Sequence, residues 1–552
     1  MKVGQVVAEI MKREGTSTLL AYPVNPLTEF AAAADIRPII VRQERIGIHM
    51  ADAMSRITSG NTVGVFCCQA GPGVENSFGA VAQAYSECVP LIVIPGGSGR
   101  AGAWTKPNFN SALNFQHVTK WCEQINDPQQ IVGAMRRAYT QARNGRPGPV
   151  LLEMPGDMWN MEVEGDFDYV PTFRALSKPD EDAVDKAAEV LINAKMPMLY
   201  AGQGVHYARG WAELRQLADL LEIPVTTSLE GKSAFPENHP LSLGSGGVAM
   251  PLPVYQHVQE SDVVLGIGAS FTATGFGIRF PTKNKTFIHN TIDPMDINKN
   301  IPTDHPLVGD SRLALKMLVE AVSDRLGGKP RGLLNGVSAR IRNQRERWLQ
   351  DWEPRLMSES KPLSPYRVIW DLLQLVDVPN TIITHDAGSP RDELSPFWQP
   401  VTPLSYIGWG KTTQLGYGLG LAMGAKLAAP DKLCINVWGD AAIGMTGMDF
   451  ETAARCNIPI LSILFNNFAM AMEFPVMQLS REKYNSTDIS GNYSEMAKAF
   501  GGYGERVTEP SEINHAILNG IAATKQGKPA LLEFITTQDK VYSTFRGEGY
   551  HS

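Results

Sequence analysis

Two short polar segments follow apolar runs in the C-terminal third of the chain. Gly439-Asp440-Ala441-Ala442 comes directly after the apolar run 433–438, and Asn466-Asn467 closes the apolar run 458–465. Both runs have the composition of buried strands, so Asp440 and Asn467 are expected at the carboxyl edge of one parallel sheet, where open α/β sheets bind ligands. Their carboxylate and amide oxygens, with a backbone carbonyl, suit a magnesium ion that also binds phosphate. The segments therefore predict a diphosphate held through a metal.

This pair of segments resembles the thiamine diphosphate (ThDP) motif, in which Gly-Asp-Gly opens a segment that Asn-Asn closes. Asp440 and Asn467 are 27 positions apart, which fits that motif. The resemblance implies that both bind Mg²⁺ together with the backbone carbonyl of Ala469, and that the surrounding residues contact the cofactor: Gly439, Asp440, Ala441, Ala442 and Asn467. Ala441 stands where the motif has its second glycine. The alternative for a Gly-Asp after a strand is an ordinary helix cap.

A predicted helix begins directly after the expected strand 38–41, and Glu44 lies near its N-terminus. Taken alone, a first-turn glutamate is a solvated charge. Beside a ThDP signature, however, the segment resembles the Arg-His-Glu of ThDP enzymes, where the glutamate hydrogen-bonds the aminopyrimidine ring. A carboxyl buried against that ring can share a proton with it. Glu44 is therefore the candidate catalytic residue, whereas Gln43 replaces a histidine common in relatives.

Three further segments are candidates for cofactor contacts. Gly71-Pro72-Gly73 resembles the Ser-Gly-Pro-Gly loop of acetolactate synthases, with a tight turn as the alternative. The backbone of segment 386–389, which follows a predicted strand, can cradle phosphate. Segment 408–420 is rich in glycine, which a helix tolerates where its backbone approaches a cofactor or another helix closely. By resemblance Leu415 supports the thiazolium ring, with ordinary packing as the alternative. The candidate residues are Gly71, Gly73, Asp386, Gly388, Ser389, Gln414 and Leu415.

The alternation of strand and helix patterns predicts an α/β chain with three doubly wound parallel-sheet domains. A length of 552 residues is too great for one core. We expect domains at 1–170, 185–330 and 360–552, which the resemblance identifies as pyrimidine-binding, middle and diphosphate-binding domains.

The middle domain of relatives binds FAD or the ADP part of coenzyme A. Neither of its glycine clusters here, 202–204 and 266–268, completes Gly-x-Gly-x-x-Gly. Ser270 stands where relatives that bind these nucleotides often have arginine, whose fork geometry suits phosphate. Neither FAD nor coenzyme A is therefore favoured, and both stay open as alternatives.

Bulk composition restricts the class of protein. A net charge of −7 argues against nucleic acid as a partner, and no apolar run reaches the length of a membrane span. The six cysteines have no Cys-x-x-Cys spacing, which indicates free thiols in a reducing compartment. The N-terminal residues lead into an amphipathic helix instead of a signal peptide, so we expect a cytoplasmic protein.

The resemblance to acetolactate synthase-like ThDP enzymes covers nearly the whole chain. It implies ThDP- and magnesium-dependent cleavage or formation of a C–C bond on a 2-oxo acid, by a carboligase or decarboxylase, through a thiazolium ylide and an enamine. It also implies a homodimer or homotetramer with each site between two chains. One alternative is a 2-hydroxyacyl-CoA lyase or oxalyl-CoA decarboxylase acting on an acyl-CoA, and another is a non-catalytic ThDP-binding subunit.

Overall fold

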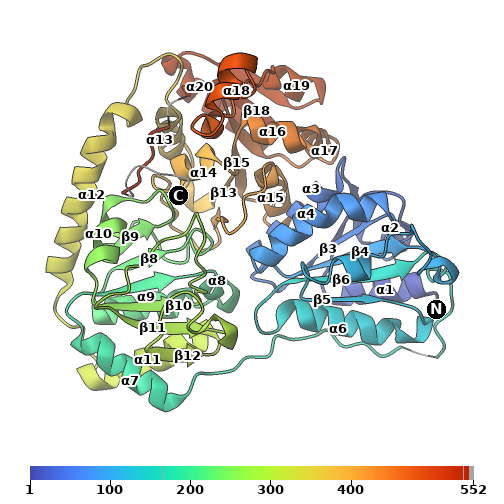
Figure 1. The fold of residues 1–552 in the computed structure, drawn as a ribbon, viewed down its shortest axis with the longest axis horizontal. Coiled ribbons are helices and arrows are strands. Elements are labelled where there is room, and N and C mark those ends of the chain that lie inside the picture. The colour runs from blue at the N-terminus through green and yellow to red at the C-terminus, as the bar shows by residue number, and fades with distance from the viewer. Residues whose placement is uncertain (166, 539, 546–552) are drawn as a thin grey trace.

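The protein is built on three six-stranded sheets with helices on both faces of each (Figure 1). The computed structural model describes residues 1–165, 167–538 and 540–545. Every pairing between its named strands is parallel. The predicted fold class, three doubly wound parallel sheets, is confirmed.

The first and third sheets share one strand order. The first is β2-β1-β3-β4-β6-β5 and the third is β14-β13-β15-β16-β18-β17, which is the same order when each is numbered from its own first strand. The first sheet consists of β1 Thr18–Ala21, β2 Arg37–Ile40, β3 Gly64–Cys68, β4 Leu91–Gly97, β5 Trp121–Gln124 and β6 Pro149–Pro155. The third consists of β13 Thr381–His385, β14 Tyr406–Ile407, β15 Leu433–Gly439, β16 Leu461–Asn466, β17 Tyr503–Val507 and β18 Ala530–Ile535.

The middle sheet has the order β12-β11-β10-β7-β8-β9. This is the strand order of dinucleotide-binding doubly wound folds, in which the order of the strands reverses between β7 and β10. Its strands are β7 Pro197–Ala201, β8 Val225–Thr227, β9 Ser242–Ser245, β10 Val263–Ile267, β11 Thr286–Thr291 and β12 His305–Val308. All three sheets lie inside the predicted domain ranges, whose boundaries stay predictions.

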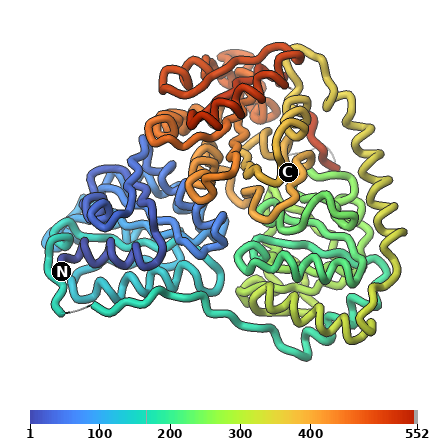
Figure 2. The backbone as a smooth tube through the Cα atoms, turned by 180° about the vertical axis from the view of Figure 1, so that it is seen from behind, coloured from blue at the N-terminus to red at the C-terminus, as the bar shows by residue number. Residues whose placement is uncertain are grey.

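Helices surround the three sheets, and one long helix crosses between domains. The helix α12 (Leu334–Leu356) runs along the outer edge from the middle domain to the third, while an extended linker joins the first domain to the middle one (Figure 2). The other helices are α1 Val3–Arg13, α2 Leu27–Ala33, α3 Glu44–Ile57, α4 Pro72–Ser86, α5 Ser111–Asn114, α6 Ile131–Arg143, α7 Glu181–Asn193, α8 Gly204–Ala208, α9 Trp211–Leu221, α10 Leu252–Glu260, α11 Ser311–Leu326, α13 Pro365–Leu375, α14 Ser389–Leu394, α15 Tyr417–Ala428, α16 Asp440–Thr446, α17 Phe450–Arg455, α18 Gln478–Tyr484, α19 Tyr493–Ala499 and α20 Ile513–Lys525.

The first and third domains meet where α3 crosses α15 at very short range. A Cβ atom built on Gly424 would lie 2.2 Å from the carbonyl oxygen of Met50, and one built on Gly420 would lie 2.3 Å from Cβ of His49. Side chains at these positions would therefore push the helices apart. The predicted helix over segment 408–420 is wrong for residues 408–416, because α15 begins only at Tyr417. The glycines of α15 are explained by the close approach of its backbone to α3.

Substituting Gly424 tests this close contact. Gly424→Ala should lower the free energy of unfolding by about 1–3 kcal/mol, because the added methyl group overlaps the α3 backbone. Gly444→Ala is the matched control: Gly444 also lies in a helix, but no described atom lies within 4 Å of its Cβ position. Urea unfolding should show a lower midpoint for Gly424→Ala than for the wild type, and an unchanged midpoint for Gly444→Ala. Equal stability of both variants would contradict the assigned helix contact.

Candidate active site

The carboxyl edge of the third sheet contains a cavity of about 320 Å³, which we call the C-terminal cavity. β15 ends at Gly439 and β16 ends at Asn466, so the residues that follow both strands reach this edge together. The predicted residues that line the cavity are Gly388, Ser389, Leu415, Gly439, Asp440, Ala441, Ala442, Asn467 and Ala469. The described lining does not include Glu44, Gly71, Gly73, Asp386 or Gln414.

Asp440 is held between the two strand ends by backbone donors. Its Oδ2 accepts hydrogen bonds from the backbone N–H of Asn467 at 3.1 Å and of Ala469 at 3.2 Å, and its Oδ1 accepts one from the N–H of Ala441 at 2.9 Å. Burial raises the pKa of this carboxyl, and these backbone donors act in the opposite direction. Asp440 is only 3% exposed, and no described basic side chain pairs with it.

The two adjacent asparagines have different roles. Asn467 lines the cavity, and its Oδ1 accepts from the N–H of Ala469 at 3.0 Å. Asn466 points away from it, donating to Glu533 at 2.7 Å and accepting from the N–H of Phe468 at 3.1 Å. Asn466 thus fixes the turn, whereas Asn467 presents an oxygen to the cavity.

These donors fit a magnesium ion. Asp440 and Asn467 supply a carboxylate and an amide oxygen, and a buried carboxylate without a cation is stabilised when a metal binds it. Among the described residues no cluster of three His, Cys, Asp or Glu side chains competes as a metal site. The ligand assignment, including the carbonyl of Ala469, stays a prediction.

Asp386 is buried and shapes the loop that carries Leu415. Its Oδ1 accepts from the backbone N–H of Gly416, and its Oδ2 from that of Gly418, both at 2.9 Å. Burial raises the pKa of Asp386 to about 6, although these hydrogen bonds lower it. The side chain of Asp386 therefore positions the start of α15. The predicted contact of Asp386 with the cofactor stays a prediction.

Gln414 faces the first domain. Its Oε1 lies 3.2 Å from Nε2 of His49 on α3, and its backbone N–H donates to Gln83 on α4 at 3.3 Å. The neighbouring Leu415 turns into the C-terminal cavity. Contacts from both domains therefore position this short segment.

Glu44 lies at the carboxyl edge of the first sheet. It begins α3, is 4% exposed, and accepts a hydrogen bond from Nδ2 of Asn76 at 3.4 Å. A Cβ on Gly73 would lie 3.5 Å from its Oε1, and Gly71 precedes α4 with a positive φ of 64°. The structure thus joins Glu44 with the predicted Gly71–Gly73 loop, in a group separate from Asp440.

Comparisons with known proteins agree with this arrangement. Three family profiles match in order: "Thiamine pyrophosphate enzyme, N-terminal TPP binding domain" at residues 1–123, its "central domain" at 184–318, and its "C-terminal TPP binding domain" at 386–534. A probable acetolactate synthase large subunit of Methanococcus aeolicus is 30% identical, over 97% of this chain and 92% of its own length. The chain belongs to the acetolactate synthase-like family of ThDP enzymes.

Other relatives extend the comparison. A probable acetolactate synthase large subunit of Methanocaldococcus jannaschii is 28% identical over 97% of this chain and 92% of its own. The acetolactate synthase large subunit of Corynebacterium glutamicum is 30% identical over 92% of this chain and 82% of its own length. The family resemblance predicted from the motifs is confirmed, and the protein is a ThDP-dependent enzyme. In the described part of this enzyme, no helix combines the length and apolar character that a membrane crossing needs.

Two residues near the C-terminus contact residues that line the C-terminal cavity. Gln538 donates through Nε2 to the backbone carbonyl of Asn467 at 2.9 Å. The hydroxyl of Tyr542 lies 2.7 Å from Oγ of Ser389 and 2.9 Å from Sδ of Met472. No local pattern could have predicted these contacts, because the partners are far apart in the sequence.

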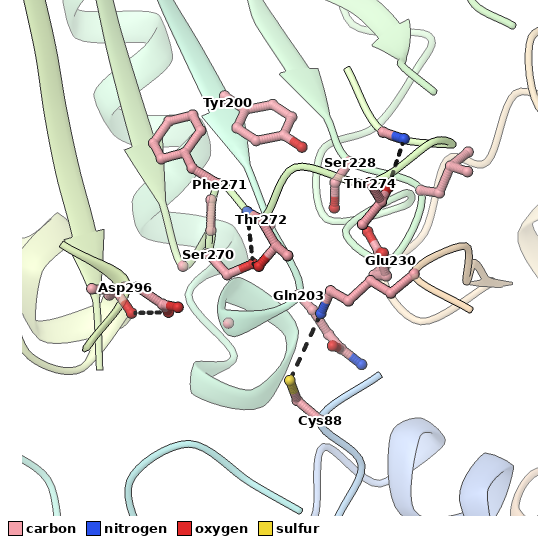
Figure 3. Close-up of a pocket in the computed structure, with 18 of the residues that line it drawn as sticks. Cys88, Tyr200, Gln203, Ser228, Glu230, Ser270, Phe271, Thr272, Thr274 and Asp296 are labelled. Atoms are coloured by element: carbon pink, nitrogen blue, oxygen red, sulfur yellow. Dashed lines mark hydrogen bonds between the residues drawn. The ribbon is translucent and has the colours of Figure 1, made fainter. Parts of the chain in front are cut away.

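A second cavity of about 540 Å³, here called the middle cavity, lies between β7 and β10, where the strand order of the middle sheet reverses (Figure 3). Backbone packing explains the glycines that line it. A Cβ on Gly202 would lie 2.4 Å from the carbonyl oxygen of Gly268, and a Cβ on Gly204 would lie 2.7 Å from the Cα of Gly268. Oγ of Ser270 bonds to Thr272 at 2.8 Å. These contacts do not require a nucleotide, so the expectation that FAD is not favoured stays a prediction.

Proposed function

We propose that this enzyme uses ThDP and magnesium to break or form the C–C bond beside the carbonyl of a 2-oxo acid, as a carboligase or decarboxylase in the cytoplasm. The observation that carries the proposal is the C-terminal cavity, where Asp440 and Asn467 face the Gly388-Ser389 turn. When bound, ThDP supplies an electron sink for the carbanion that such chemistry requires.

The chain's own residues have separate tasks in this proposal. Asp440, Asn467 and the Ala469 carbonyl would hold the metal, which would supply positive charge for the diphosphate. Backbone N–H groups at Gly388 and Ser389 would hold phosphate oxygens, since they lie where α14 begins. Leu415 gives the cavity an apolar wall. These assignments extend the motif resemblance residue by residue.

Glu44 is proposed to hold the proton that the aminopyrimidine ring shares. It is buried, and Asn76 donates to one of its oxygens, which fixes the carboxyl against the Gly71–Gly73 loop. The substrate proposal is a small 2-oxo acid, and neither nucleic acid nor a membrane is a proposed partner.

We propose further that each site forms between two chains of a homodimer or homotetramer. Glu44 does not line the described C-terminal cavity of its own chain. Apolar side chains are exposed near both groups of site residues. In the first domain they are Phe78 and Tyr85 on α4, and in the third domain, around Asp440, they are Met445, Met448, Phe468 and Met470. Exposed apolar groups gathered near a site are typical of surfaces that a partner covers.

A second candidate is a lyase or decarboxylase acting on an acyl-CoA. The middle cavity favours it, because four basic and two acidic side chains line that cavity and its charge therefore suits an anionic nucleotide. Phe276 lines both cavities, so they adjoin each other. The guanidinium carbon of Arg391 lies 4.2 Å from the centroid of the Phe276 ring.

A Glu44→Gln variant tests the catalytic assignment. With ThDP and magnesium present, the wild-type enzyme should release carbon dioxide or a coupled product from a 2-oxo acid, and the variant should be slower by about 10²–10⁴-fold. ThDP affinity, measured by calorimetry, should stay unchanged because the proposed metal site is intact. Glu75→Gln, an exposed first-turn glutamate of α4, is the control and should keep the wild-type rate.

The substrate that the enzyme accepts separates the 2-oxo acid proposal from the acyl-CoA proposal. Product formed from 2-hydroxyacyl- or oxalyl-CoA, with none from 2-oxo acids, would replace the first proposal by the second. An unchanged rate in Glu44→Gln would remove the catalytic role of Glu44.

Mixed oligomers test the shared site. Glu44→Gln and Asp440→Asn chains should each be inactive alone, and co-expression should restore part of the wild-type rate, because one site of a mixed dimer then carries both intact residues. The rate per mole of each tagged, purified oligomer measures this. A mixed oligomer as inactive as its parents would show that Glu44 and Asp440 act within one chain.

A further inference from the structure

Cys88 lies on the wall of the middle cavity and is not one of the residues assigned to ThDP. It follows α4 and is half-buried, and in Figure 3 its sulfur points toward Gln203 and Glu230. Its backbone has a φ of 58°, in the left-handed region that non-glycine residues rarely adopt. This conformation is held by the surrounding structure and places the sulfur at the cavity surface.

Two cations from different domains approach this sulfur. Nε of Arg146, in the loop before β6, donates to Sγ at 3.0 Å, and Nζ of Lys411, in the loop before α15, lies 3.7 Å away. Glu87 fixes the second loop, because its Oε1 accepts from the backbone N–H of Lys411 at 2.7 Å and of Gly410 at 3.1 Å. Cationic neighbours favour the thiolate form of a cysteine, which is its nucleophilic form.

Arg146 and Lys411 stay protonated next to the sulfur although both are partly or fully buried. Burial lowers the pKa of each, but the neighbouring Cys88 and nearby carboxylates raise it by more, so both pKa values lie above the ordinary value. Arg146 is also oriented from behind by Asp296, whose carboxylate lies 2.7 Å from its Nη1.

The other cysteines have different surroundings. Burial raises the pKa of Cys67, Cys68 and Cys434. Cys456 is buried, and its Sγ accepts from Nη1 of Arg455 at 3.5 Å. Cys122 offers the closest comparison, because it is half-buried like Cys88. Its Sγ donates to the carbonyl of Ala112 at 3.0 Å, whereas the corresponding bond from Sγ of Cys88 to the carbonyl of Ser86 is longer, at 3.7 Å. Burial raises the pKa of Cys122. Cys88 therefore combines a cavity, two cations and partial exposure.

We propose that Cys88 is a reactive cysteine that exchanges with small anionic disulfides entering the middle cavity. The Cys88 sulfur attacks one sulfur of the disulfide, a new S–S bond forms, the old S–S bond breaks, and the other half leaves as a thiolate. No further oxidant or reductant is consumed. The excess of basic side chains around the cavity selects an anionic reagent.

The test is mass spectrometry of the full-length enzyme after incubation with oxidised glutathione, an anionic peptide disulfide. We expect one adduct, mapped to Cys88, and none on Cys122. Cys122→Ser should give the same adduct at the same rate, whereas Cys88→Ser should give none. Arg146→Gln and Lys411→Met should each slow the reaction by about tenfold, since each removes one cation from beside the thiolate.

Two results would overturn the proposal. One is a rate of modification of Cys122 as high as that of Cys88. The other is an unchanged rate of Cys88 modification in both Arg146→Gln and Lys411→Met, provided that circular dichroism shows both variants to be folded. Cystamine, a cationic disulfide, should react more slowly than oxidised glutathione, and the reverse order would contradict the charge argument. None of these measurements depends on turnover, so they are independent of the proposed 2-oxo acid chemistry.

Discussion

The burial of one carboxylate between two strand ends constrains the C-terminal half of the protein. Removing a charged group from water is costly unless other groups compensate. For Asp440 the compensation comes from the backbone N–H groups of Asn467 and Ala469, which follow the neighbouring strand. Phe468 between them adopts a positive φ of 58°, and Asn466 anchors the turn to Glu533. The arrangement keeps a negative charge at the cavity without a described basic partner, which is the condition for binding a divalent cation.

A second constraint joins the first and third domains. Glycines of α15 let its backbone lie against α3, and a buried network of Asp52, Arg56 and Tyr417 crosses the same contact. Asp386 holds the loop before α15 from the other side, through the N–H groups of Gly416 and Gly418. The position of Leu415 in the cavity therefore depends on both domains. A change in how the domains pack would move the cavity wall.

Much of this could be predicted from sequence, and what was missed has a physical pattern. The motif residues Asp440 and Asn467 were placed together because parallel strands end at a common edge. Five strands were not predicted: β5, β9, β12, β14 and β17. All five lie at sheet edges, where a strand pairs on one side only and need not form an apolar run. β17, for example, contains Glu505 and Arg506.

Side-chain direction was harder to predict than element position. Asp386 and Gln414 lie in the predicted loops, yet their side chains bind the α15 turn and the first domain instead of lining the cavity. The tail residues Gln538 and Tyr542 reach the site through contacts that join distant parts of the chain. Such contacts depend on tertiary packing, which has no local sequence signal.

The most direct test of the central claim is the magnesium dependence of ThDP binding, measured by calorimetry in the wild type and in Asp440→Asn. If Asp440 binds the metal that holds the diphosphate, magnesium should tighten ThDP binding to the wild type by at least about tenfold and should have little effect on the variant. Circular dichroism would confirm that the variant is folded. Equal tightening by magnesium in both proteins would contradict the claim that Asp440 is a metal ligand.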